Sequence, residues 1–283
     1  MRKFKTWQAD LILLFVAAIW GSTFIIVKKA TSDMPTFMFL ATRFSVAAIS
    51  LAILRPHKKY WLNKDMWKSG FLIGVVLFGG YGFQTLGLQY TSAAKTGFIT
   101  GLSVVLVPVI VAIFDKKLPA KKTTLGIVLA TIGLGLLSLN GFSIALGDFL
   151  VFLCAICFAL HIYSVAHFSK RYDAISITTI QILTVAILST IATFLFETGA
   201  TVVWSGSVWW ALILTAIPAT SLAFLAQNGL QRYTTATHTA LIFASEPAFS
   251  YIFAYMIANE VLTTQNTIGA VLILLGVVFA ETE

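Results

Sequence analysis

The chain alternates between long apolar stretches and short polar connections along its whole length. Ten such stretches can be drawn, and each is long enough to cross a hydrocarbon core of roughly 30 Å as a helix of about 20 residues. They are continuous rather than alternating with a period of two, which excludes the strands of a membrane barrel. The pattern predicts helices over residues 9–29, 35–54, 68–89, 94–114, 123–139, 148–169, 175–196, 207–230, 236–258 and 263–280.

The composition places these stretches in a membrane rather than in a soluble core. Apolar residues make up 58% of the chain and charged residues only 11%, whereas soluble domains carry about 25% charged residues. The first apolar stretch lacks a small-residue cleavage site and ends at Lys28 and Lys29, so we expect a retained helix rather than a signal peptide. The sequence therefore predicts an all-α, multi-pass protein of the cell membrane.

The basic residues are distributed unevenly between the two sets of connections. If the N-terminus is cytoplasmic, 15 of the 19 lysines and arginines fall on the cytoplasmic side, and only Lys28, Lys29 and Lys95 fall on the other. Such an excess is typical of cytoplasmic loops, and it predicts that both termini are cytoplasmic. Because the net charge of +8 is spread over short loops, it does not indicate nucleic-acid binding.

The chain also contains an internal repeat. A shift of 143 residues aligns QYTSAAKTGFI from Gln89 with RYTTATHTALI from Arg232, and a shift of 138 aligns AAIWGSTF with AICFALHI. Each half, 1–140 and 141–283, then carries five predicted helices. Because five is odd, the second half starts on the opposite side of the membrane. We therefore expect inverted repeats with a substrate site near the midplane between them.

Several short stretches, taken in order, resemble the EamA branch of the drug/metabolite transporter superfamily. They are WGSTF (20–24), the RF pair at Arg43, the connections YTSA and YTTA, the SEP turn at Ser245, and NEVLTTQNTIGAVLILLGV (259–277). The resemblance implies a ten-helix fold with a central cavity and the movement of small metabolites, often outward. One departure is Lys117, which occupies the first-half position that matches Glu260.

Two charged residues lie deep inside predicted helices, where an ionised group is costly and by default marks function. Glu246 is the only one of the 11 acidic residues far from a helix end. We interpret it either as a carboxyl that couples to substrate or protons, or as a structural acceptor beside Pro247, which interrupts helical hydrogen bonding. Arg43 is the one deep cation. It either pairs with Glu246 or hydrogen bonds to the carbonyls of neighbouring helices.

Uncharged polar and aromatic residues provide the candidate lining of the cavity. Trp20 and Thr23 share one face of the first helix, and the repeat places His161 at the position that matches Thr23. Gln84 and Gln227 also coincide in the repeat. Packing, or hydrogen bonds that join helices, is the alternative role for these residues. The predicted substrate-binding residues are Trp20, Thr23, Tyr81, Gln84, His161, Gln227 and Asn228.

Lys95 and His238 occupy equivalent first turns of two predicted helices. We assign them, with the two deep charged residues, to coupling or gating, and for Lys95 the alternative is snorkelling to the lipid headgroups. Cys154 and Cys157 lie in an apolar helix without further ligand-type residues at suitable spacing. We expect packed thiols there rather than a metal or redox site, and no cofactor is predicted.

These features favour transport over the other functions of membrane proteins. An enzyme would need paired carboxylates, an HExxH segment or a GxSxG segment, and a channel would normally show a pore helix or charged rings. One deep acid, one deep arginine, amides and aromatic rings suit a zwitterionic or amphipathic metabolite such as an amino acid. The alternative is an organic cation, such as a quaternary amine, held by aromatic rings. We also expect a lipid bilayer and protons as partners, and a monomer or weak dimer.

Overall fold

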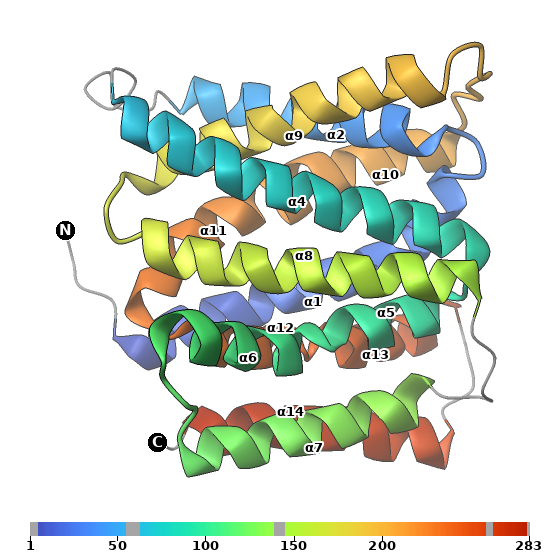
Figure 1. Ribbon diagram of the computed structural model, residues 1–283. Coiled ribbons are helices and arrows are strands. Elements are labelled where there is room, and N and C mark those ends of the chain that lie inside the picture. Colours follow the sequence, from blue (N-terminus) through green and yellow to red (C-terminus); the bar gives the residue numbers. More distant parts are fainter. Residues whose placement is uncertain (1–4, 55–62, 139–144, 259–262, 282–283) are drawn as a thin grey trace.

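The computed structural model describes residues 5–54, 63–138, 145–258 and 263–281, and the elements within these ranges are helices (Figure 1). Glu260 lies outside them. The first half forms α1 (Thr6–Ala30), α2 (Thr36–Ile53), α4 (Lys64–Tyr90), α5 (Ala93–Gly101), α6 (Ser103–Asp115) and α7 (Lys121–Ser138). The second half forms α8 (Leu146–Phe168), α9 (Ala174–Phe196), α10 (Gly206–Ala216), α11 (Ala223–Leu230), α12 (Ala236–Phe243), α13 (Glu246–Ala258) and α14 (Thr264–Glu281).

The length and surface of these helices fit a bilayer. Among the described residues, seven helical runs are long and apolar enough to cross a membrane, and α14 is a shorter apolar helix. Large apolar side chains such as Phe15, Phe194 and Trp210 are exposed on the outside of the bundle. Such a surface is unfavourable in water and favourable against lipid tails. The protein is therefore a multi-pass membrane protein.

Two of the predicted helices are interrupted at positions that match in the repeat. Leu102 separates α5 from α6, and a turn at Ser245, 143 residues later, separates α12 from α13. In the second break the Ser245 hydroxyl donates to a carbonyl of α12 at 2.6 Å, and Pro247 has no N–H to continue the helical ladder. The two helices expected to be continuous here therefore each consist of two shorter ones.

The helix predicted over 207–230 is also irregular. Between α10 and α11 lies a π-helical turn, Ile217–Leu222, and a 3₁₀ turn follows α11. Pro218 lacks the N–H that an α-helix would use, and the hydroxyls of Thr220 and Ser221 donate to carbonyls five residues earlier, at 2.7 and 3.0 Å. The π turn changes which carbonyl and hydroxyl groups face the centre of the bundle.

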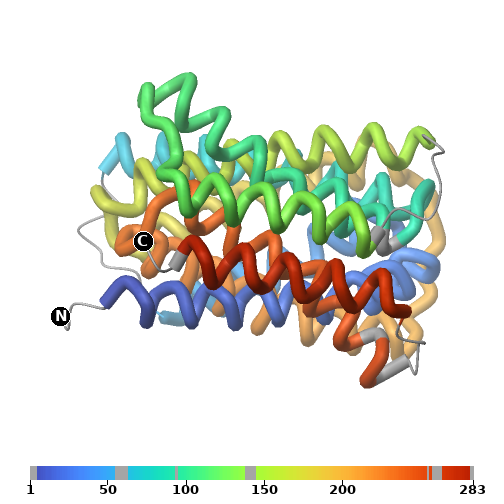
Figure 2. Tube along the Cα trace, turned by 90° about the horizontal axis from the view of Figure 1, so that it is seen from below, coloured from blue at the N-terminus to red at the C-terminus, as the bar shows by residue number. Residues whose placement is uncertain are grey.

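The helices pack mainly in pairs that are distant in the sequence. α4 packs on α8 and α9, α2 on α9, α1 on α13, and α7 on α14, and Figure 2 shows the last pair side by side. Their close approach requires glycine. A Cβ atom on Gly126 would lie 2.5 Å from the Gly276 carbonyl oxygen, and one on Gly133 would lie 2.5 Å from the Gly269 carbonyl oxygen. Small residues bring membrane helices into contact in this way.

The start of α1 and the end of α14 lie at the same end of the bundle (Figure 1). At the other end, hydrogen bonds join the two halves. Ser205 and Ser207 hydroxyls donate to the Asp33 carboxylate at 2.6 and 3.1 Å, and these bonds lower the pKa of Asp33. The Glu197 carboxylate accepts two backbone N–H groups from the first turn of α2 at 2.8 and 2.9 Å. It thereby satisfies donors that a helix start leaves free.

Candidate functional site

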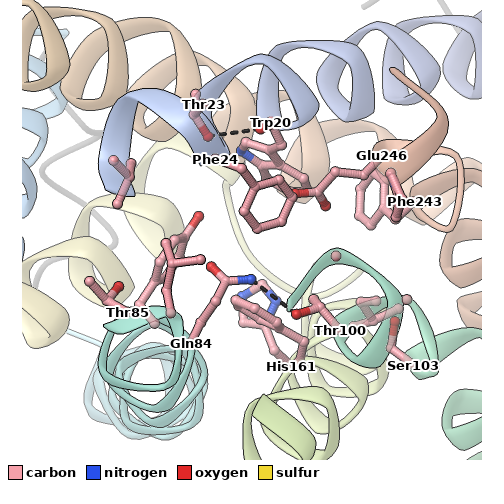
Figure 3. Close-up of a pocket in the computed structure, with 18 of the residues that line it drawn as sticks. Trp20, Thr23, Phe24, Gln84, Thr85, Thr100, Ser103, His161, Phe243 and Glu246 are labelled. Carbon is pink, nitrogen blue, oxygen red and sulfur yellow. Dashed lines mark hydrogen bonds between the residues drawn. The ribbon is translucent and has the colours of Figure 1, made fainter. Parts of the chain in front are cut away.

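A cavity lies where α1, α2, α4, α5, α6, α8, α11, α12 and α13 meet. It contains about 850 Å³ of empty space, part of it open to solvent. Figure 3 shows labelled residues of α1, α12 and α13 facing those of α4, α5, α6 and α8 across this space. Its lining includes Trp20, Thr23, Phe24, Arg43, Tyr81, Gln84, Thr100, Ser103, Phe158, His161, Ile162, Phe224, Gln227, Phe243 and Glu246.

Most of these lining residues match one another in the two repeat registers. The matched pairs are Trp20 with Phe158, Thr23 with His161 and Phe24 with Ile162 at a shift of 138, and Tyr81 with Phe224, Gln84 with Gln227, Thr100 with Phe243 and Ser103 with Glu246 at a shift of 143. Both members of each pair line the cavity. The two halves therefore contribute equivalent positions with different chemistry, and only the second half contributes a carboxyl at the helix break.

Trp20 is the centre of an aromatic wall. Its ring centroid lies 5.3 Å from that of Phe224 and 4.9 Å from that of Phe243. Its indole N–H donates to the Ala219 carbonyl of the π turn at 2.8 Å. Tyr81 extends the wall, with its ring edge-to-face against Phe224 at 6.2 Å. Because the indole N–H is already bonded, Trp20 offers the cavity its ring rather than a hydrogen-bond donor.

Arg43 is held by the π turn and by Tyr81. Its Nε donates to Thr220 Oγ1 at 2.8 Å, and a terminal N–H donates to the Tyr81 hydroxyl at 3.4 Å. The guanidinium carbon lies 4.7 Å from the Tyr81 ring centroid, a favourable cation–π geometry. Within the described ranges no ion pair joins Arg43 to Glu246, although both line the cavity. Arg43 therefore bonds to oxygen atoms of neighbouring helices rather than pairing directly with Glu246. These oxygen atoms belong to side-chain hydroxyls, not to the backbone carbonyls that the sequence suggested.

Glu246 is the first residue of α13 and lines the cavity. It is partly exposed to that space, and no hydrogen bond or ion pair to another residue of the described chain engages its carboxyl group. A structural role beside Pro247 would require the carboxylate to accept a backbone N–H. An ionised carboxylate has only acceptors, so Glu246 is open to a donor group on a ligand.

Three further polar side chains line the cavity with different hydrogen-bonding states. Gln84 Nε2 donates to Thr100 Oγ1 at 3.2 Å. Gln227 Oε1 and His161 Nε2 have no partner among the described residues, although the two residues are only 1% and 2% exposed. Buried polar atoms are normally hydrogen bonded, so these two atoms are candidates for ligand contacts.

The observed lining of the cavity lacks one predicted residue and includes others that were not predicted. Asn228 does not line it; the residue is fully buried, and its Nδ2 donates to the Phe224 carbonyl at 2.9 Å. Successive helix positions are rotated by about 100°, so Asn228 cannot share the face of its predecessor. Phe224 and Phe243 were not predicted. The repeat register would have found Phe224 as the partner of the predicted Tyr81, whereas the partner of Phe243 is Thr100, which was also not predicted.

Lys95 and His238 do not line the cavity but form ion pairs between the two halves. Lys95 on α5 lies 3.3 Å from Asp148 in the first turn of α8, and Asp148 also accepts the Thr91 hydroxyl at 2.6 Å. His238 Nε2 on α12 lies 3.8 Å from Asp10 on α1, which is an ion pair when the histidine is protonated. Each contact therefore joins a helix of one half to a helix of the other.

The cysteines and potential metal ligands show no cluster in the described chain. Cys154 is buried, Cys157 is partly buried, and both are free thiols. The Cys154 sulfur lies 3.8 Å from Thr100 Oγ1. Among the described residues, no three His, Cys, Asp or Glu side chains are grouped so as to hold a metal ion.

Comparisons with known proteins agree with this architecture. The sequence model of the EamA-like transporter family matches the chain twice, over residues 7–139 and 145–282. A relative from Archaeoglobus fulgidus, described as an uncharacterized transporter, is 38% identical over 98% of this chain and 87% of its own length. Bacillus subtilis YyaM, with the same description, is 30% identical over 96% of this chain and 92% of its own. One solved crystal structure has the same fold, with a TM-score of 0.79 and 21% identity over 97% of both chains.

Proposed function

The chain belongs to the EamA-like transporter family, and from this premise we propose that it is a secondary-active transporter that moves a small metabolite across the cytoplasmic membrane by alternating access. The observation that supports this most directly is a cavity whose walls come from matched positions of the two halves. Equivalent movements of two such halves can open a central site to either side in turn. The family resemblance favours export.

We propose ten membrane crossings in two inverted five-helix halves, with both termini cytoplasmic. Each helical run, interrupted or not, makes one crossing. The glycine contacts of α7 with α14 support a twofold relation, because Gly126 meets Gly276 and Gly133 meets Gly269. A shift of 143 residues converts Gly126 to Gly269 and Gly133 to Gly276. The twofold relation between the halves therefore turns the Gly126–Gly276 contact into the Gly269–Gly133 contact.

Cysteine labelling in cells tests this topology. We expect Lys121→Cys to react with a membrane-impermeant maleimide only from inside, because Lys121 belongs to a basic connection, and Thr201→Cys to react only from outside. Both positions are exposed. The unsubstituted protein, whose cysteines are buried or partly buried, measures the background. Reaction of both variants from the same side would contradict the inverted arrangement.

We propose that the two ion pairs act as gates at opposite ends of the cavity. Lys95 matches His238 at a shift of 143 residues, and Asp10 matches Asp148 at a shift of 138, so the two pairs are equivalents in the repeat. In the proposed topology the Lys95–Asp148 pair lies at the outer end and the His238–Asp10 pair at the cytoplasmic end. Weakening one pair destabilises the conformation that is closed at that end. The population then shifts toward the conformation that is open at the same end.

Neutralising one gate should change access to the cavity in a defined direction. We expect Asp148→Asn to increase the labelling rate of a cavity cysteine, Thr23→Cys, from outside by about threefold or more, and Asp10→Asn to decrease it. The rate of reaction with an impermeant thiosulfonate on cells gives the comparison. Asp65→Asn, an exposed acid at the start of α4, is the matched control. Equal rates in all variants would rule out the gates.

The cavity suits a zwitterionic or amphipathic metabolite such as an amino acid. Arg43 uses two N–H groups on Thr220 and Tyr81, and a guanidinium has five, so donors remain for a carboxylate. The free carboxyl of Glu246 and the ring of Trp20 suit an ammonium group. An organic cation without a carboxylate, such as a quaternary amine, is the second candidate, because the aromatic wall alone can hold it.

Transport by the purified protein tests the proposal. A thermal-shift screen against amino acids, quaternary amines and nucleobases identifies compounds that stabilise the protein, because a ligand of the folded state raises its stability. Proteoliposomes that contain the protein should then exchange labelled for unlabelled compound across the membrane, and empty liposomes should not. Stabilising compounds that are bound but never exchanged would contradict the transporter function.

A further inference from the structure

A chain of two buried amides ends at the cavity wall. Gln231 Nε2 donates to the Ile162 carbonyl at 2.7 Å, and Gln227 Nε2 donates to Gln231 Oε1 at 3.0 Å. Gln231 is fully buried and Gln227 is 1% exposed. Gln227 lines the cavity, whereas Gln231 does not.

The backbone carbonyl of Ile162 fixes which end of each amide donates and which end accepts. A backbone carbonyl oxygen only accepts hydrogen bonds, so Gln231 must turn its NH₂ group toward Ile162. Its oxygen then faces Gln227, which must in turn present its own NH₂ group. The two ends of an amide are assigned from such a network, and here the network allows one assignment. The Gln227 oxygen is left over as an acceptor.

This acceptor has no partner in the described part of the chain. Gln227 Oε1 is buried and makes no hydrogen bond there, and a buried polar atom without a partner is unfavourable. A ligand in the cavity that carries an N–H or O–H group would satisfy it. A group without such a hydrogen would leave it unsatisfied.

Other groups around the cavity require the same ligand chemistry. When Glu246 is ionised, its carboxylate has only acceptors. The indole N–H of Trp20 is already donated to Ala219, so Trp20 offers a π face. A negative charge, a π face and a fixed oxygen together favour a cation that carries hydrogen. His161 Nε2, also without a partner among the described residues, adds a second acceptor in one of the two imidazole tautomers.

We propose that Gln227 Oε1 accepts a hydrogen bond from a protonated amine of the transported molecule, so that the site selects ammonium groups that carry N–H over quaternary ammonium groups. Gln231 acts as the positioning residue, because it fixes the amide of Gln227. The proposal rests on the transport function above and narrows its substrate class to amines that keep at least one N–H.

A methylation series of one aromatic amine tests this selectivity. Phenethylamine, its N,N-dimethyl form and its N,N,N-trimethyl form are all cations at neutral pH, but only the last has no N–H. Calorimetric titration of the purified full-length protein gives their dissociation constants. We expect the dimethyl compound to bind about tenfold or more tightly than the trimethyl compound, although the two differ by a single methyl group.

Variants then assign the selectivity to the amide chain. Gln227→Met keeps the length of the side chain and removes the acceptor, so the preference for the dimethyl compound should disappear. Gln231→Leu should reduce it, whereas Gln231→Glu should retain it in the protonated form, which can both donate to Ile162 and accept from Gln227. Asn228→Leu, which removes a buried amide outside the cavity wall, should retain the preference.

The outcomes separate this proposal from the transport function. Equal binding of the dimethyl and trimethyl compounds by the wild-type protein would overturn it, and so would an unchanged preference in Gln227→Met. Failure of all three compounds to bind at millimolar concentration would also count against it. Because the wild-type series needs no variant, a folding defect cannot hide the answer. Proteoliposomes that exchange an identified substrate without amine selectivity would reject the acceptor role alone, whereas selective binding without exchange would reject transport.

Discussion

Replacing Glu246 by glutamine is expected to abolish the response of transport to a pH gradient while exchange of substrate across the membrane continues. Glutamine has nearly the same shape but cannot take up and release a proton. Within the described chain, Glu246 is the acid that lines the cavity, so we expect its proton and a bound ammonium group to compete for the same space. Acids at the ends of the bundle lack this direct competition.

The measurement is accumulation of substrate in proteoliposomes with and without an imposed pH gradient. If one proton exchanges for one substrate molecule, a gradient of one pH unit supports accumulation of up to about tenfold. We expect this ratio in the wild type and in Asp115→Asn, where the removed acid is exposed at the end of α6, and no accumulation in Glu246→Gln. Persistent gradient-driven accumulation in Glu246→Gln would reject the coupling role of Glu246.

A large loss of stability is expected when a methyl group is added between α7 and α14. In Gly133→Ala the new Cβ would lie 2.5 Å from the Gly269 carbonyl oxygen and 2.9 Å from the Ile273 backbone nitrogen. Backbone atoms of packed helices cannot move aside as a flexible side chain can. The helices must separate, and overpacking of this kind costs about 1–3 kcal/mol.

Thermal unfolding in detergent measures this effect. Gly206→Ala is the matched control, since nothing lies within 4 Å of a Cβ atom at that position. Gly269→Ala repeats the test from the other helix, where the new Cβ would meet the Gly133 carbonyl oxygen at 2.7 Å. We expect Gly133→Ala and Gly269→Ala to unfold at a clearly lower temperature than Gly206→Ala. Equal unfolding temperatures would show that the two helices tolerate separation.

The sequence alone predicted an all-helical membrane protein of the EamA family, and the family assignment is confirmed. Each predicted helix has an observed counterpart, with ends displaced by up to a few residues. The irregular positions were missed for a physical reason. The longer runs around Leu102 and Ile217 are mainly apolar, so hydrophobic periodicity does not separate a continuous α-helix from a break or a π turn. Pro218, which directly follows Ile217, was the one local signal of an irregular helix there.

The polar lining was easier to predict than its partners. An amide or charge inside an apolar span is conspicuous, and Gln84, Gln227, His161 and Glu246 all line the cavity, although their roles stay predictions. The hydrogen bonds around them depend on tertiary packing. Neither the buried chain through Gln231 nor the ion pairs of the two halves follow from local pattern, because each joins segments far apart in the sequence.

The π turn at Ile217–Leu222 makes the cavity sensitive to the length of the chain at that point. One extra residue is accommodated in the turn, and the helix that follows is rotated by about 100° relative to an uninterrupted one. We expect deletion of Pro218, which lacks the N–H of a regular helix, to restore a regular α-helix without changing any lining side chain. The same deletion is expected to turn the side chains of Gln227 and Phe224 away from the cavity together. The number of residues in this turn therefore decides which side chains of the following helix line the cavity.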